Sequence, residues 1–388
     1  MGDYFRGGMH GGVPDDITCG DSPDQSNRFA RCWTDYHNGA HVRESLRGHA
    51  MKLSHSAFMQ RLWRGALLVG VMLCSSFALP GYAAAPQVGV QAPGYYRMML
   101  GKFEITALSD GTVDVPLNKL LKGAPHERIT ALQARAHQSA EAAETSINAF
   151  LINTGNQLIL VDTGAGQLFG PTAGGLLPQN IRAAGYQPEQ IDAVLLTHIH
   201  VDHSGGLSVD GKAVFPNAVV YVDRHDADYW LNAANAARAA PGQRHNFAQS
   251  EAVFAPYLRA GKVKRFDGEQ ELFPGIRPLR MPGHTPGHAF FEISSEGQRL
   301  QLWGDTIHAQ HVQFPEPGVA IDFDVDSVAA VTMRKRAMAD AAAKGYWVGA
   351  AHIAFPGIGH VRREGEGFAW VPVEYSLNRA AAQADINH

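Results

Sequence analysis

The stretch LLTHIHVDHSGG (residues 195–206) constrains the fold of this chain more than any other. An apolar run of buried-strand length leads into it, and three histidines and an aspartate then follow within six residues. Residues two apart in an extended segment point to the same side, so His198 and His200 can grip one ion. Asp202 and His203 come after a turn and can face a second ion. The stretch therefore predicts a strand that delivers metal ligands at its carboxyl end, where α/β proteins commonly bind ligands.

Three later polar residues have the same placement, each after a strand-like run. His284 lies in MPGHTPGH, Asp305 ends LQLWGD, and His352 ends YWVGAAH. A single aspartate at a strand end is usually a turn or cap residue, but the whole set in one chain favours a shared metal centre. Imidazole nitrogen and carboxylate oxygen are ligands that zinc and similar divalent cations accept.

Strand and helix patterns alternate along the chain in two similar halves. Strands are predicted at 102–111, closed by a turn, at 146–164 as a pair, and at 191–197, 218–223, 288–294, 300–305 and 346–352. Helices are predicted at 179–184, 226–231 and 326–344, the last ended by Gly345. This rhythm predicts layered sheets with helices outside them.

Composition narrows the class of protein. Of 388 residues, 45% are hydrophobic and 18% are charged, which is typical of a globular protein with a sizeable core. The formal charge of −4 gives no electrostatic footprint for nucleic acid. We expect a small-molecule substrate.

The amino-terminal part of the sequence is typical of a targeting region. Residues 1–50 lack apolar periodicity and are expected to be a disordered or untranslated extension, with Met51 as an alternative start. Residues 51–85 have a basic beginning, an apolar run at 65–79 and the small-residue stretch PGYAAAP, which is typical of a signal peptide. Because the apolar run is short for a membrane span, we expect cleavage and a periplasmic or secreted protein without a stable span, rather than an uncleaved anchor. Residues 86–388 are then one domain.

All three cysteines, Cys19, Cys32 and Cys74, precede the expected cleavage site. The mature chain would have no disulfide, no thiol nucleophile and no cysteine ligand. Any metal must be held by histidine and carboxylate.

The H-x-H-x-D-H segment with its downstream His, Asp and His resembles the metallo-β-lactamase superfamily in its dinuclear hydrolase form. The stretches TSINAFLINTGNQLILVDTGAG, FPNAVV and GHTPGH resemble methyl parathion hydrolase and its bacterial relatives. The resemblance implies a single α/β domain with an αββα sandwich. It also suggests a homodimer.

The resemblance further implies a ligand set and a chemistry. Two divalent ions per chain, most commonly Zn²⁺, would share a bridging hydroxide that attacks esters, lactones or organophosphate triesters. Asp202 could also pass a proton to the leaving group. The first ion would be held by His198, His200 and His284, the second by Asp202, His203 and His352, and both by Asp305.

Other positions carry weaker expectations. Phe169, Trp230 and Phe247 match the aromatic pocket wall of the parathion hydrolases, although they could equally be core or lid residues. His308 departs from the relatives and could assist the substrate oxyanion or simply flank the pocket. Residues that could orient metal ligands are Asp162, His288 and His360.

Three alternatives stay open. A glyoxalase II-type thioesterase would share the seven ligands, but the carboxyl-terminal segment has no basic cluster for glutathione. A β-lactamase of this superfamily would carry Cys or Ser at the position of Asp305. A non-catalytic metal-binding protein would normally close the coordination shell of its ion.

Overall fold

The computed structural model describes residues 85–139, 141–239 and 244–376. The extension predicted for 1–50 and the signal peptide predicted for 51–85 lie outside these residues, apart from Ala85. The compact unit that contains the chain from Gln91 onward carries all the elements below. Among the described residues, no helix combines the length and the hydrophobicity needed to cross a bilayer.

The first sheet has seven strands in the order β1-β2-β4-β5-β6-β9-β10. β5, β6, β9 and β10 run parallel, whereas β1, β2 and β4 pair antiparallel. Parallel neighbours end at the same edge, so the loops after β5 and β6 emerge side by side. The strands are β1 Tyr95–Leu100, β2 Phe103–Val115, β4 Ala143–Asn153, β5 Leu158–Val161, β6 Ala193–Leu195, β9 Val219–Asp223 and β10 Val263–Phe266.

The second sheet has six strands in the order β11-β12-β13-β15-β16-β17. Only β13 and β15 are parallel neighbours in it, so the loops after these two strands leave the same edge. The strands are β11 Ile276–Arg280, β12 Ala289–Ser295, β13 Gln298–Leu302, β15 Trp347–Gly349, β16 Ile358–Glu364 and β17 Gly367–Pro372.

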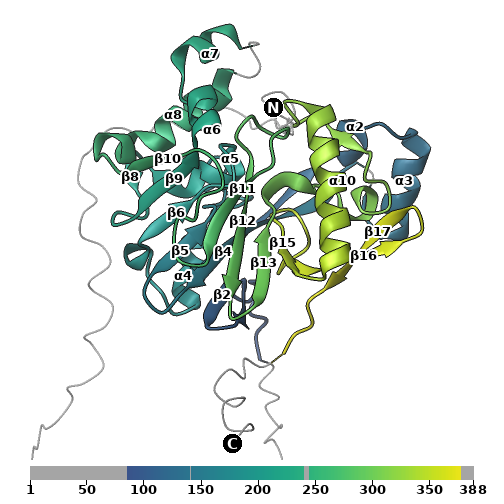
Figure 1. The fold of residues 1–388 in the computed structure, drawn as a ribbon, viewed down its shortest axis with the longest axis horizontal. Helices are drawn as coiled ribbons and strands as arrows, with labels where there is room; N and C mark the ends of the chain where they lie inside the picture. The colour runs from purple at the N-terminus through teal and green to yellow at the C-terminus, as the bar shows by residue number, and fades with distance from the viewer. Residues whose placement is uncertain (1–84, 140, 240–243, 377–388) are drawn as a thin grey trace, which may run out of the picture. The chain divides into compact units, whose positions relative to one another are not determined.

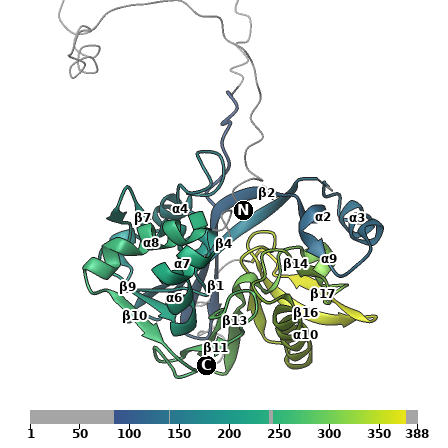
Figure 2. The same cartoon turned by 90° about the horizontal axis from the view of Figure 1, so that it is seen from above.

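Helices cover the outer faces of both sheets. Three helices cover the first sheet and share a buried apolar cluster with it: α4 (Leu177–Ala183), α6 (Arg224–Trp230) and α8 (Arg244–Arg259). The helix α10 (Ser327–Lys344) covers the second sheet over another buried cluster. A third cluster, which includes Ile152, Leu195 and Phe291, fills the space between the sheets. Figures 1 and 2 show α6 and α8 on one side of the paired sheets and α10 on the other. The predicted αββα sandwich is confirmed.

Short elements complete the unit around this core. Two small sheets pair β3 (Leu121–Lys122) with β14 (Ala320–Ile321) and β7 (Ser208–Val209) with β8 (Lys212–Ala213). The short helices are α2 Leu117–Leu120, α3 His126–Arg135, α5 Val201–Ser204, α7 Ala233–Arg238 and α9 Gln310–Gln313, with 3₁₀ turns η2 Pro188–Gln190, η3 Gly205–Leu207 and η5 Gly304–Thr306.

Most of the predicted elements are present, with one clear error. The predicted helix at 326–344 is α10, and Gly345 ends it in the left-handed conformation, with φ 67°. The turn predicted at Gly111 is wrong: β2 continues to Val115 across a bulge between Ser109 and Gly111. Gly111 has φ 129°, which a bulge tolerates in glycine. The sequence patterns also did not predict α8, which contains Pro256.

The contact between the sheets can be tested through Phe291, whose side chain is fully buried there. Phe291→Ala should lower the free energy of unfolding by about 3–5 kcal/mol, because it removes apolar contact and leaves a cavity. Tyr375→Ala removes an aromatic ring that is 85% exposed and should cost less than about 0.5 kcal/mol. Denaturant unfolding measures both, and equal losses would contradict a core between the sheets.

Candidate metal centre

The seven side chains predicted as metal ligands come together at one end of the sandwich. They follow the carboxyl ends of β6, β11, β13 and β15, so both sheets contribute. In each of two groups, the ligand atoms lie within 4.8 Å of one another. The first group is His198, His200, His284 and Asp305, and the second is Asp202, His203, His352 and again Asp305.

Asp305 belongs to both groups through different oxygens. Its Oδ2 lies 3.1 Å from His284 Nε2 and 3.6 Å from His198 Nε2. Its Oδ1 lies 2.9 Å from His203 Nε2 and 3.1 Å from His352 Nε2. One carboxylate therefore faces two separate sets of ligands, which is the arrangement of a bridging group.

The spacing of these atoms fits cations of the size of zinc. Ligand atoms around a tetrahedral zinc lie about 3.3–3.6 Å apart, given the usual bond lengths. The contacts to Asp305 span 2.9 to 3.6 Å, and His352 Nε2 lies 3.2 Å from Asp202 Oδ2. His198 Nε2, His203 Nε2 and Asp305 Oδ1 are buried without a hydrogen-bond partner. Buried polar atoms normally have partners, so the residues present fit two bound cations.

The second ring nitrogen of three ligands is anchored. His203 Nδ1 donates to Asp162 Oδ2 at 2.9 Å, and His284 Nδ1 donates to Asp324 Oδ1 at 2.9 Å. His352 Nδ1 donates to the Ser146 carbonyl at 2.8 Å. These bonds place the proton on Nδ1 and leave Nε2 as a lone-pair donor toward the centre.

Asp162 orients the H-x-H-x-D-H segment. It lies directly after β5, next to the strand from which that segment leaves, and it has φ 61°. Its Oδ1 accepts from the Thr197 amide and its Oδ2 from the Thr197 hydroxyl, both at 2.8 Å. His198 Nδ1 lies 3.0 Å from that same hydroxyl oxygen. One buried carboxylate thus holds a ligand in each group, His203 directly and His198 through Thr197.

His288 holds the backbone of the bridging residue. Its Nε2 accepts from the Asp305 amide at 3.1 Å and its Nδ1 donates to the Met281 carbonyl at 3.1 Å. Burial, with the neighbouring His284, lowers the pKa of His288 to about 3, so the ring is neutral and can accept. Gly304 makes room for this contact: it has φ 49°, and a Cβ there would lie 2.8 Å from His288 Nε2.

Asp226 ties two ligand loops together and was not found from the sequence. This buried residue of α6 accepts from the Ile199 amide at 2.7 Å, in the loop of His198 and His200. It also accepts from the Thr285 hydroxyl at 3.0 Å and the Gly287 amide at 2.6 Å, in the loop of His284. No local pattern marks Asp226, because its role depends on how α6 packs over these loops.

Asp324 and Arg334 are a second feature that the sequence did not indicate. Asp324 accepts from His284, and its other oxygen lies 4.0 Å from the guanidinium of Arg334. Arg334 is buried on α10 and donates to the carbonyls of Thr306 at 2.7 Å and Val319 at 2.6 Å. Arg334 therefore supports both the partner of His284 and the residue that follows Asp305.

Strong electrostatic coupling marks the centre. Burial alone would raise the pKa of Asp305, but the surrounding histidines, His203 first among them, hold it well below its ordinary value. Against the effect of burial, the carboxylates raise the pKa of His284 to about 9 and that of His352 to about 10. Ligating imidazoles must be neutral, so binding of a cation would release these protons.

His308 also reaches the centre, as its position after Asp305 suggested. Its Nε2 lies 3.0 Å from Asp305 Oδ2, and its ring stacks on His352 with centroids 5.3 Å apart. Both histidines line a cavity of about 210 Å³, which Glu144, Ser146, Gln310 and His311 also line.

The predicted aromatic wall is divided between two clusters. The Trp230 ring lies 5.3 Å from His200 and 4.9 Å from Phe247, and both aromatic side chains are buried in the cluster under α6 and α8. Phe169 is half-buried and packs against a different cluster, around α2, α3 and α9. The structure thus brings Trp230 directly to a metal ligand. A substrate-contacting role for the three residues stays a prediction.

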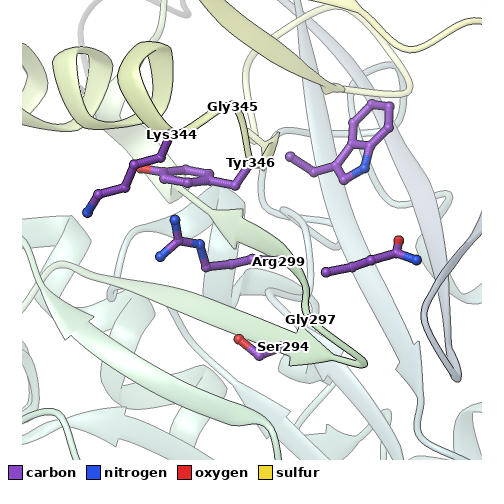
Figure 3. Close-up of a pocket in the computed structure, with 8 residues that line it drawn as sticks. Ser294, Gly297, Arg299, Lys344, Gly345 and Tyr346 are labelled. Carbon is purple, nitrogen blue, oxygen red and sulfur yellow. The ribbon is translucent and has the colours of Figure 1, made fainter.

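Two other features lie apart from the centre. His360, on β16, packs against Trp347 with ring centroids 3.9 Å apart. A larger cleft of about 500 Å³ lies between the β12–β13 turn and the end of α10 (Figure 3). Its charged groups already have partners: the Arg299 guanidinium lies 4.3 Å from the Tyr346 ring centroid, and Lys344 pairs with Asp340 at 2.7 Å. No metal ligand lines this cleft among the described residues.

Residues 142–344 match the family model described as the metallo-beta-lactamase superfamily. The solved structure of a hydrolase of the beta lactamase superfamily, AbOPH, is 37% identical with a TM-score of 0.71. That match covers 74% of this chain and 100% of AbOPH. The chain belongs to the metallo-beta-lactamase superfamily.

Further members of the superfamily are similar over shorter or more divergent stretches. AidC, a dizinc quorum-quenching lactonase solved with a product, is 28% identical with a TM-score of 0.67, over 73% of this chain and 99% of AidC. An N-acyl homoserine lactonase from Bacillus sp is 28% identical over 174 residues, which is 40% of this chain. This chain spans 61% of the length of that lactonase.

Asp324→Asn tests the support of the first ligand group. The amide accepts more weakly from His284, so the affinity of the first site for zinc should fall about 10- to 100-fold. The second site should keep its affinity, because the partners of His203 and His352 are unchanged. Chelator competition resolves the two affinities.

Asp322→Asn is the matched control, since this exposed residue of the same segment pairs with Lys122 and, among the described residues, contacts no metal ligand. Equal weakening of both sites in Asp324→Asn, or the same loss in the control, would contradict a specific role.

Proposed function

We propose that the protein is a metal-dependent hydrolase that uses two divalent cations, preferably zinc, on esters and lactones, with organophosphate triesters as further substrates. The observation that carries the proposal is the single carboxylate of Asp305 that faces two groups of ligands. Each ion would have three ligands of its own and would share the fourth, Asp305, with the other ion. Structural zinc sites instead close four ligands around a single ion. When bound, two such ions generate a nucleophile from water at neutral pH and polarise the scissile bond.

Lactones are favoured among these substrates. AidC and the Bacillus relative are both named as lactonases. AidC is also named as a dizinc protein, which supports zinc as the cation here. The described residues of this centre offer only imidazole and carboxylate ligands, which suit zinc but also accept other divalent cations.

Two residues of the centre would handle protons and charge. The Asp202 side chain is 13% exposed, compared with 3% for Asp305, so Asp202 is the more accessible of the two carboxylates. It would take up a proton and pass it to the leaving oxygen. His308 lines the cavity and its Nε2–H donates to Asp305 Oδ2 at 3.0 Å, so the same N–H would have to be shared with, or turned to, a developing oxyanion.

An activity screen tests the proposal directly. Zinc-loaded protein is offered lactones, aryl esters, a paraoxon-like triester and nitrocefin. We expect hydrolysis of lactones and esters that is lost after chelation and restored by zinc. Protein that carries two zinc ions and hydrolyses none of these compounds would overturn the proposal, and nitrocefin as the best substrate would favour a β-lactamase.

Asp305→Ala tests the shared carboxylate. Removing it takes a ligand from both groups at once, so zinc stoichiometry should fall below two per chain, and lactone hydrolysis should fall with it. Asp305→Asn keeps the shape but loses the charge and should lie between the alanine variant and wild type. Elemental analysis and kinetics on the same samples measure both effects. Two ions still bound in Asp305→Ala would rule out a bridging role.

His308→Phe tests the oxyanion donor. All seven metal ligands remain, so zinc content should stay at two, whereas kcat for lactones should fall by up to about 10²–10³-fold. His360→Phe removes a histidine outside the centre and should leave kcat unchanged. An unchanged kcat in His308→Phe would place this residue outside the chemistry.

A further inference from the structure

A cavity of about 210 Å³ lies beside His308 and His352. We propose that it receives a short, uncharged, hydrogen-bonding group of the substrate, and that Glu144 turns anionic substrates away. This inference rests on the proposed hydrolase function, because it assigns the part of the substrate that lies next to the scissile bond.

The cavity lies next to the candidate metal centre. His308 and His352 form one side, and both have an Nε2 atom about 3 Å from the Asp305 carboxylate, at 3.0 and 3.1 Å. The other sides come from β2, α2, β4, α9 and the segment after α3. A substrate group bound in the cavity would therefore lie close to the scissile bond.

The size of the cavity limits that group. Its volume is about 210 Å³, whereas pockets for drug-sized ligands hold about 300–1,000 Å³. A short substituent fits, but a long acyl chain or a large aryl system would have to extend outside. Trp230 packs against His200, a ligand of the other group, and Phe247 packs against Trp230. Neither aromatic residue lines this cavity.

Polar groups with spare hydrogen-bonding capacity line the cavity. Ser146 Oγ accepts from the Phe355 amide at 3.3 Å, and its own hydroxyl hydrogen can donate. Gln310 Oε1 accepts from the Ala354 amide at 3.1 Å, and Gln310 Nε2 lies 2.9 Å from His311 Nε2. An amide nitrogen carries two hydrogens, so one of them remains for a ligand. A substrate amide or hydroxyl can pair with these groups, whereas an alkyl group would leave them without partners.

The charge of the lining opposes anions. No lysine or arginine is among the described residues that line the cavity, and Glu144 is the acid there. His352 would be neutral as a ligand in the metal-loaded protein, so Glu144 would then carry the charge of the lining. Asp114 is the partner of Glu144 in the β2–β4 register, so a second carboxylate lies directly opposite. Like charges at such positions destabilise a sheet. Within the described part of the chain, the Glu144 side chain accepts from the Thr112 hydroxyl at 2.9 Å and has no cationic partner. A substrate carboxylate in the cavity would meet the carboxylate of Glu144, with that of Asp114 behind it outside the lining.

The test uses esters that differ in one terminal group: methyl, carboxamide or carboxylate. One series places the group on the acyl side, as para-nitrophenyl esters of butanoic, succinamic and succinic acids. The other places it on the alcohol side, as acetate esters of butanol, hydroxybutanamide and hydroxybutanoic acid. We expect wild type to prefer the carboxamide and to discriminate against the carboxylate in at least one series.

The decisive variant is Glu144→Lys, which also places opposite charges across the β2–β4 pair. It should raise kcat/KM for the carboxylate ester relative to the methyl ester by about 3- to 10-fold, with Glu144→Gln in between. Glu189→Lys makes the same change in net charge at an exposed residue of η2, before β6 and thus at the opposite edge of the sheet, and should leave the ratio unchanged.

The outcomes separate the two proposals. Metal-loaded protein that hydrolyses none of the esters or lactones would overturn the hydrolase function itself. Active protein whose ratios are the same in Glu144→Lys and Glu189→Lys, in both series, would overturn the cavity assignment alone.

Discussion

The arrangement of this molecule depends on the Asp305 carboxylate and its contact with two groups of imidazoles. A buried carboxylate is costly unless charge and hydrogen bonds compensate for its lost hydration, and here histidines approach both of its oxygens. The position of the Asp305 carboxylate is also fixed through the backbone of this residue, which is hydrogen-bonded. His288 accepts from its amide, and the glycine before it leaves space for that ring.

Three further carboxylates extend this control outward, each from a different part of the chain. Asp162 follows β5, Asp226 lies on α6, and Asp324 precedes α10. Each holds a ligand, or the loop that carries ligands, by hydrogen bonds between 2.6 and 3.0 Å. A strand end, an outer helix and the segment before another outer helix thereby fix side chains at the end of the sandwich, and rigid support of this kind keeps ligands in place for an incoming ion.

Local patterns were sufficient for layered sheets with outer helices and for the residues that converge at one end, whereas the αββα arrangement was predicted from the resemblance to a known superfamily. Four of the ligands lie in one short segment, and the others each follow a strand pattern. Asp226 and Asp324 left no such signal, since their partners are brought to them only by the packing of α6 and of the segment before α10. The turn expected at Gly111 failed for a related reason: pairing with β4 carries β2 through the bulge, so tertiary structure overrides a local turn preference.

The origin of the ligands has a consequence for folding. Each group combines residues that leave the first sheet with residues that leave the second, so a bound cation would act as a non-covalent cross-link between the two halves of the sandwich. An ion that binds only the folded chain stabilises it in proportion to the logarithm of its free concentration over its dissociation constant. The separation of the sheets and the release of the metal would then be one coupled event, and the resistance of this protein to unfolding would vary with the supply of divalent metal in its surroundings.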